Sequence, residues 1–353
     1  MTRPSAPRAR RPAWRRAPRV LLAGLAVALV LGGGAWAAWR YETTGIEIPA
    51  GAPAVRLVVP PGASAEAIGR HLQALGLVRH PLVFRALARS RGVGAQLKAG
   101  EYALSGPLSL EGILGVLERG DVVRRDLTVP EGRNLDEVAA LVAGEGLDLE
   151  AFLEAARDPS PVHDLDPAAV DLEGYLFPDT YDVPQSPEAP RALVRRMAQR
   201  FREVVGPQLE RIAERGFTVR QVVTLASIVE LETASPDERP RIAAVFLNRL
   251  EKGMPLQTDP SIIFALKKAG RWDGNIRKPD FDIDSPYNTY RRAGLPPGPL
   301  GSPGREALLA VIEPAPTKDL YFVSRNDGTH EFSETLTAHN RAVNRYQRRR
   351  ASS

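Results

Sequence analysis

The chain of 353 residues contains no cysteine. This absence excludes disulfides, zinc–thiolate sites and cysteine nucleophiles, although it does not fix the compartment, because an oxidising space tolerates cysteine-free proteins. The sequence also lacks the HxxxH and HxH spacings of many metal sites, so we interpret His330 and His339 as structural residues. We therefore expect neither a metal nor another cofactor.

A basic domain surface is also lacking, despite a net charge of +5. Residues 1–19 hold seven arginines and no acid, and the rest of the chain carries 40 basic against 42 acidic residues. The basicity is therefore a local tail, which argues against a nucleic-acid partner.

Residues 20–39 carry no charge at all. Twenty such residues are about the length that crosses a bilayer as a helix. The arginine-rich side is expected to stay in the cytoplasm, with Trp36 and Trp39 at the far interface. The alternative is a signal peptide cleaved near residues 35–37, but the apolar run exceeds the usual ~7–15 residues. We expect a single-pass protein of the cell membrane, with the remainder on the periplasmic or extracellular side.

Two related segments follow, seventy residues apart. The turn at residues 59–62 (VPPG) matches the turn at residues 129–132 (VPEG), and Gly76 matches Gly146. Each turn lies between a predicted strand and two predicted helices. A β-α-α-β module of this size resembles LysM, a carbohydrate-binding fold, although a spacer that holds the catalytic part away from the membrane is an equal alternative.

The strongest candidate for chemistry lies at the end of an apolar helix. Thr218 and Gln221 form the pattern of a capping box, and nearly every residue from 222 to 229 is apolar or small, so this helix is expected to be buried. Glu230 ends the run, and burial there would raise its pKa enough for acid/base catalysis. A solvent-facing Glu230 is the ordinary alternative. Glu232 lies about 200° further around the helix, so it should point away from Glu230.

Two polar clusters follow this helix. Gln257 and Asp259 precede a proline, and Tyr287, Asn288 and Tyr290 lie in a loop rich in proline and glycine. From these clusters we take Gln257, Asp259, Asn288 and Tyr290 as substrate-binding candidates that hydrogen-bond or stack on sugar rings. The alternatives are an ordinary helix cap and a rigid structural loop.

Together these clusters resemble the endolytic murein transglycosylase family, MltG (YceG-like). The resemblance rests on residues 173–181 (EGYLFPDTY), 225–230 (LASIVE), 256–260 (LQTDP), 287–290 (YNTY), 294–298 (GLPPG) and 320–323 (LYFV). It places Glu230 at the family's catalytic glutamate. The chain departs from the family pattern at Leu231, where lysine is expected, at Phe264 (tyrosine) and at Ala338 (glutamate).

The resemblance implies a lyase that cuts the MurNAc–GlcNAc β-1,4 bond of nascent peptidoglycan strands and leaves 1,6-anhydro-MurNAc ends, which would limit strand elongation. Its partners would be glycan strands, the lipid bilayer and the peptidoglycan synthases. Two alternatives are a hydrolase that uses Asp259 or Asp179 as a second carboxylate and a non-catalytic glycan-binding scaffold.

The expected fold class is α+β, with a single transmembrane helix, small LysM-like modules and a mixed helical/β catalytic domain. The expected segments are an arginine-rich tail (1–19), the transmembrane helix (20–39), a linker (40–54), the two modules (55–160), the catalytic domain (161–345) and a basic tail (346–353).

Overall fold

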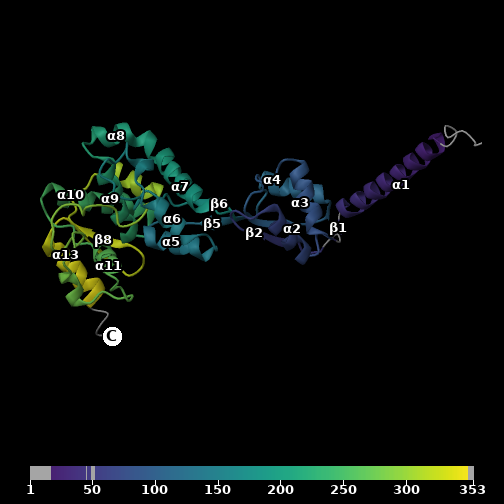
Figure 1. The fold of residues 1–353 in the computed structure, drawn as a ribbon. Helices are drawn as coiled ribbons and strands as arrows, with labels where there is room; N and C mark the ends of the chain where they lie inside the picture. The colour runs from purple at the N-terminus through teal and green to yellow at the C-terminus, as the bar shows by residue number, and fades with distance from the viewer. Residues whose placement is uncertain (1–16, 45, 49–51, 349–353) are drawn as a thin grey trace, which may run out of the picture. The chain divides into compact units, whose positions relative to one another are not determined.

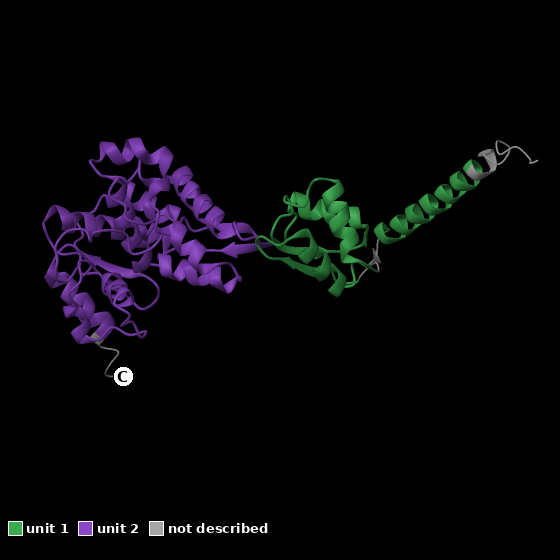
Figure 2. Cartoon of the chain, viewed as in Figure 1, with its two compact units in different colours: residues 1–123 green, residues 124–353 purple. Residues whose placement is uncertain are grey.

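The computed structural model describes residues 17–44, 46–48 and 52–348, so most of both predicted tails lies outside the described residues. The chain divides between Val123 and Arg124 into two compact units (Figure 2). Helices and small antiparallel sheets make up both units, which confirms the α+β class (Figure 1). The likeness of the repeated modules to LysM stays a prediction.

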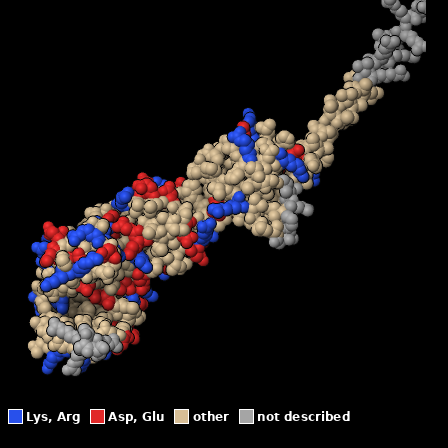
Figure 3. All heavy atoms as spheres, turned by 90° about the horizontal axis from the view of Figure 1, so that it is seen from below, with Lys and Arg blue, Asp and Glu red and all other residues tan. Residues whose placement is uncertain are grey.

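Unit 1 begins with α1 (Ala17–Thr43). The segment Leu21–Thr43 is long and apolar enough to cross a membrane, with a mean hydropathy of 2.0. Figure 3 shows this helix almost free of charged side chains. Within the predicted linker (40–54), α1 continues to Thr43 and β1 (Ile46–Glu47) pairs with β4 (Pro107–Leu108).

The first repeat forms the core of unit 1. It contains β2 (Val55–Val59), α2 (Ala65–Ala74) and α3 (Pro81–Ser90), followed by β3 (Gly100–Leu104) and α4 (Leu110–Arg119). β2 pairs antiparallel with β3. The apolar faces of these elements enclose a core of their own that includes Leu57, Leu72 and Phe84.

The second repeat belongs to unit 2. β5 (Arg124–Thr128), α5 (Leu135–Gly144) and α6 (Leu149–Ala156) reproduce the first repeat, and β5 pairs with β6 (Thr180–Pro184). Gly62 and Gly132 hold the same left-handed backbone conformation, with φ of 71° and 76°, which only glycine adopts readily. The second repeat nevertheless shares one core with the rest of unit 2. The boundary between the compact units lies at residues 123–124, and the division into modules (55–160) and a catalytic domain (161–345) stays a prediction.

The rest of unit 2 is mainly helical. It contains α7 (Ala189–Val205), α8 (Leu209–Glu214), α9 (Val219–Glu232), α10 (Arg239–Glu251), α11 (Asp259–Lys268), α12 (Arg305–Ile312) and α13 (Leu336–Val343). β7 (Tyr321–Ser324) and β8 (His330–Ser333) pair as an antiparallel hairpin. Helix α9 packs against α10, α11 and α12, so this helix lies at the centre of the unit.

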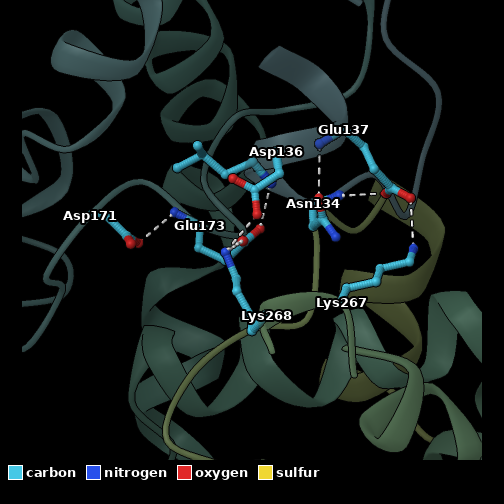
Figure 4. A network of polar contacts seen from close by, with 8 residues as sticks. Asn134, Asp136, Glu137, Asp171, Glu173, Lys267 and Lys268 are labelled. Atoms are coloured by element: carbon cyan, nitrogen blue, oxygen red, sulfur yellow. Dashed lines mark hydrogen bonds and ion pairs between the residues drawn. The ribbon is translucent and has the colours of Figure 1, made fainter. Parts of the chain in front are cut away.

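Charged side chains join α5 of the second repeat to α11 (Figure 4). Lys267 Nζ lies 2.7 Å from Glu137, and Lys268 Nζ lies 3.1 Å from Asp136 and 3.6 Å from Glu173. The backbone N–H of Leu135 donates to Glu173 Oε1 at 3.0 Å. These contacts hold α11 against α5. Helix α11 also lines two cavities of unit 2, which are described below.

Burial raises the pKa of Glu173 to about 7, although Lys268 and the Leu135 N–H act in the opposite direction. The carboxyl is thus easier to protonate in the folded state than in the unfolded chain, so stability is lost as pH rises from about 4.5 through about 7. Glu173→Gln is expected to remove this loss, on the order of 3 kcal/mol at pH 8, with little change at pH 4. Urea unfolding of the wild type and of Glu173→Gln at pH 4 and at pH 8 measures this difference in the free energy of unfolding. The control is Glu150→Gln, whose side chain is 81% exposed. A Glu173→Gln protein that is as stable as the wild type at both pH values contradicts the prediction.

Candidate active site

Helix α9 carries the two candidate carboxyls at its C-terminal end. Its predicted capping box is confirmed, since Thr218 and Gln221 bond reciprocally. All residues from Val222 to Val229 are buried, which confirms the expected apolar helix. Glu230 and Glu232 then leave the last turn in different directions and meet different surroundings.

Both oxygens of Glu230 are held inside the protein. Arg239 Nη2 donates to Oε1 at 2.6 Å, and the backbone N–H of Gly304 donates to Oε2 at 2.9 Å. The side chain of Glu230 is 6% exposed and that of Arg239 is 8% exposed. Burial raises the pKa of Glu230, and the nearby Glu131 carboxyl acts in the same direction. The predicted burial and pKa direction are thus present, but Glu230 is engaged in an internal ion pair.

Glu131 completes this cluster from the turn of the second repeat. The Glu131 carboxyl lies 3.4 Å from Arg239 Nη2. It also packs closely on Gly304, where an added Cβ atom would lie 1.8 Å from Glu131 Oε1. Sequence reasoning missed Glu131, Arg239 and Gly304. The one available signal was the repeat itself, because the second turn has an acid where the first turn has Pro61.

Glu232 faces an open cavity of about 420 Å³. The Thr258 hydroxyl donates to its carboxylate. Burial, with a smaller contribution from Asp259, raises the pKa of Glu232 to about 7, although the Thr258 hydrogen bond acts in the opposite direction. Glu232 therefore combines what a general acid needs, namely a proton near neutral pH and access to a ligand.

Three of the four predicted substrate-binding residues line the same cavity as Glu232. They are Gln257, Asp259 and Tyr290, and the Tyr290 hydroxyl donates to Asp259 at 2.5 Å. Gln257 has a φ of 50°, a left-handed conformation that costs energy for a side chain of this kind and is frequent at functional sites. The structure thus brings these three residues together around Glu232 instead of Glu230.

Asn288, the fourth predicted residue, is fully buried. Its amide donates to the carbonyls of Phe281 and Ile283 at 2.9 and 2.8 Å, and its side-chain oxygen accepts from the N–H of Tyr290 at 3.0 Å. All its polar atoms are used inside the loop, so it cannot contact a ligand directly. It holds the loop that presents Tyr290.

Both histidines considered in the sequence also line the cavity. His330 Nδ1 lies 2.7 Å from Glu238 Oε2, and His339 stacks on Tyr321 with ring centroids 5.2 Å apart. In the described part of the chain, no group of three or more His, Cys, Asp or Glu side chains is arranged to hold a metal ion.

The comparisons with known proteins agree on one family. The model of the YceG-like family matches residues 57–345. Two relatives are named "Endolytic murein transglycosylase". The one from Bacillus subtilis is 32% identical over 83% of this chain and 84% of its own length. The one from Streptococcus pneumoniae D39 is 34% identical over 82% of this chain, which spans only 58% of that relative's length. A crystal structure of a putative yceG-like protein from Listeria monocytogenes is 29% identical and covers 81% of this chain and 98% of its own, with a TM-score of 0.56. The chain therefore belongs to the YceG-like family.

Proposed function

We propose that this protein is an endolytic lytic transglycosylase that cuts the MurNAc–GlcNAc β-1,4 bond of peptidoglycan strands, with Glu232 as its single acid/base. Two relatives bear the name of this activity. The observation that carries the residue assignment is the placement of Glu232 in an open cavity beside Gln257, Asp259 and Tyr290. Glu230, the residue favoured by the sequence, instead bonds to Arg239 and the Gly304 N–H.

The mechanism needs one carboxyl in two protonation states. Protonated Glu232 donates to the bridging oxygen, and the bond from that oxygen to C1 of the muramic acid breaks. The resulting carboxylate takes the proton of the C6 hydroxyl, whose oxygen attacks C1 and closes the 1,6-anhydro ring. The nucleophile belongs to the substrate itself, so its effective concentration is high and no water is needed.

A hydrolase is the second candidate, because the Asp259 carboxylate lines the same cavity as Glu232 and two carboxylates are the usual equipment of glycoside hydrolysis. Asp179, the other sequence candidate, pairs with Arg200 and does not line this cavity. Mass spectrometry of glycan ends separates the two reactions. Anhydro ends from the wild type and far fewer from Glu232→Gln are expected, whereas free reducing ends would establish the hydrolase.

The pH dependence of cleavage follows from the raised pKa of Glu232. A general acid must be protonated at the start, so kcat/KM is expected to fall as pH rises through about 7. Initial rates on purified glycan strands between pH 5 and 9 measure this limb, and residual activity of Glu232→Gln should lack it. A rate that increases across pH 7 would mean that the ionised carboxyl starts the reaction.

The membrane arrangement is a further part of this proposal. α1 anchors the enzyme, the arginine-rich segment lies in the cytoplasm, and unit 2 acts on nascent strands outside it, next to the synthases that make them. The apolar, uncharged character of α1 supports the anchor. A form without residues 1–40 that fully replaced the anchored protein in cells would contradict the need for anchoring.

A further inference from the structure

A second cavity, of about 350 Å³, includes Leu231 at the end of α9 in its lining. We call it the Trp272 cavity. It is lined by Pro130, Glu131, Gly132, Arg133, Asn134, Glu137, Leu231, Pro260, Ile263, Phe264, Lys267, Trp272 and Leu300. We propose that it binds an uncharged N-acetylhexosamine ring of the same glycan strand that Glu232 cuts. This inference rests on the proposed function and extends it to a second binding subsite.

One wall of the Trp272 cavity is apolar. Trp272, Phe264 and Ile263 lie on or after α11, and Leu231 belongs to the last turn of α9. Leu231 is 41% exposed although the preceding residues of α9 are buried. An apolar wall with a few polar groups opposite is the usual form of a small-molecule site. A sugar ring offers the matching surfaces, because its C–H faces are apolar and its edges carry hydroxyl and amide groups.

The charged side chains that line the cavity are balanced in sign. Glu137 lies 2.7 Å from Lys267 Nζ and 3.6 Å from Arg133 Nη1, and Glu131 contacts Arg239. Two acids and two bases line the cavity, so no unpaired charge favours an anionic or cationic ligand. The groups still supply acceptors and donors for hydroxyls. This balance favours N-acetylglucosamine over a muramic acid unit that carries a charged peptide.

Neighbouring residues of the chain line the Trp272 cavity and the cavity beside Glu232 at two places. Leu231 lines the first and Glu232 the second, while Pro260 lines the first and Asp259 the second. The Cα atoms of neighbouring residues are about 3.8 Å apart. A ligand that fills both cavities must therefore pass over the end of α9, which an extended polymer of sugar rings can do.

Trp272 allows a direct test, since the other three tryptophans lie within residues 1–39. The full-length protein with Trp14, Trp36 and Trp39 replaced by phenylalanine, and with Glu232→Gln to prevent cleavage, is titrated with peptide-free glycan strands. A saturable shift of Trp272 emission to shorter wavelength is expected. Strands that co-sediment with the protein without this shift, or that do not bind at all, overturn the proposal.

A matched pair of leucine variants makes the test specific. Leu231 and Leu149 are both on helices and both 41% exposed, but only Leu231 lines the cavity. Leu231→Gln is expected to weaken strand binding about tenfold and, with Glu232 intact, to raise KM about tenfold with kcat within twofold, whereas Leu149→Gln changes neither. Equal effects of the two variants overturn the proposal. If Trp272 emission shifts but the wild-type products lack anhydro ends, the binding subsite is supported and the proposed transglycosylase reaction is contradicted.

Discussion

Replacing Glu232 by glutamine is expected to lower the rate of strand cleavage by about 10²–10⁴-fold, the usual contribution of a general acid/base. The amide keeps the size of the side chain and can still accept the Thr258 hydrogen bond, but it cannot donate a proton to the bridging oxygen. Release of anhydro ends from purified strands measures the loss. The folded state should not suffer, because the substitution removes a carboxyl whose ionisation is opposed by burial.

The control is Glu230→Gln, which differs only by two positions on the same helix turn. Cleavage by folded Glu230→Gln is expected to exceed that of Glu232→Gln by at least tenfold. The opposite order, with Glu230→Gln folded but inactive and Glu232→Gln active, would return the catalytic role to Glu230 as the sequence suggested. Both variants are compared at a temperature where circular dichroism shows them fully folded.

The second large effect is on stability, and it belongs to Arg239. Removing its charge leaves the buried Glu230 carboxyl without its cation at 2.6 Å and close to the Glu131 carboxyl. Breaking a buried ion pair from one side typically costs roughly 3–5 kcal/mol. Arg239→Gln is therefore expected to lower the free energy of unfolding by several kcal/mol at neutral pH, measured by urea denaturation.

A double-mutant cycle isolates the pair. Glu230→Gln is expected to be less harmful than Arg239→Gln, because burial opposes the ionisation of Glu230. The double variant should lose less than the two single losses combined, since neither charge of the buried pair remains. Losses that simply add would show that the 2.6 Å contact contributes nothing of its own.

The sequence predicted what local patterns determine. The capping box at Thr218 and the buried run after it define α9, and the two repeated turns follow from equally local signals. The sequence favoured Glu230, whereas the proposed function assigns the acid/base role to Glu232. The choice depends on residues far along the chain, with Arg239 and Gly304 closing on one carboxyl and Thr258 and Asp259 leaving the other beside a cavity.

Other features also depended on the folded structure and could not be predicted from the sequence. Asn288 has a side chain suited to sugars, but only the folded loop shows that its amide is consumed by Phe281 and Ile283. The two repeats are alike in sequence, but only the structure shows that α5 and α6 bury their apolar faces in the core of unit 2.

The two repeated turns, at residues 59–62 and 129–132, make different contacts and therefore tolerate different substitutions. The first serves only the small core of unit 1. The second carries Glu131 into contact with Arg239. The N–H of Gly132 donates to the Ser302 carbonyl, and the N–H of Ser302 donates to the carbonyl of Arg133. Substitutions in the first turn should accumulate freely as long as the bend survives. A substitution in the second turn must preserve the contact of Glu131 with Arg239, the hydrogen bonds to the Ser302 segment and the lining of the Trp272 cavity. The two similar segments are therefore expected to diverge in sequence at unequal rates.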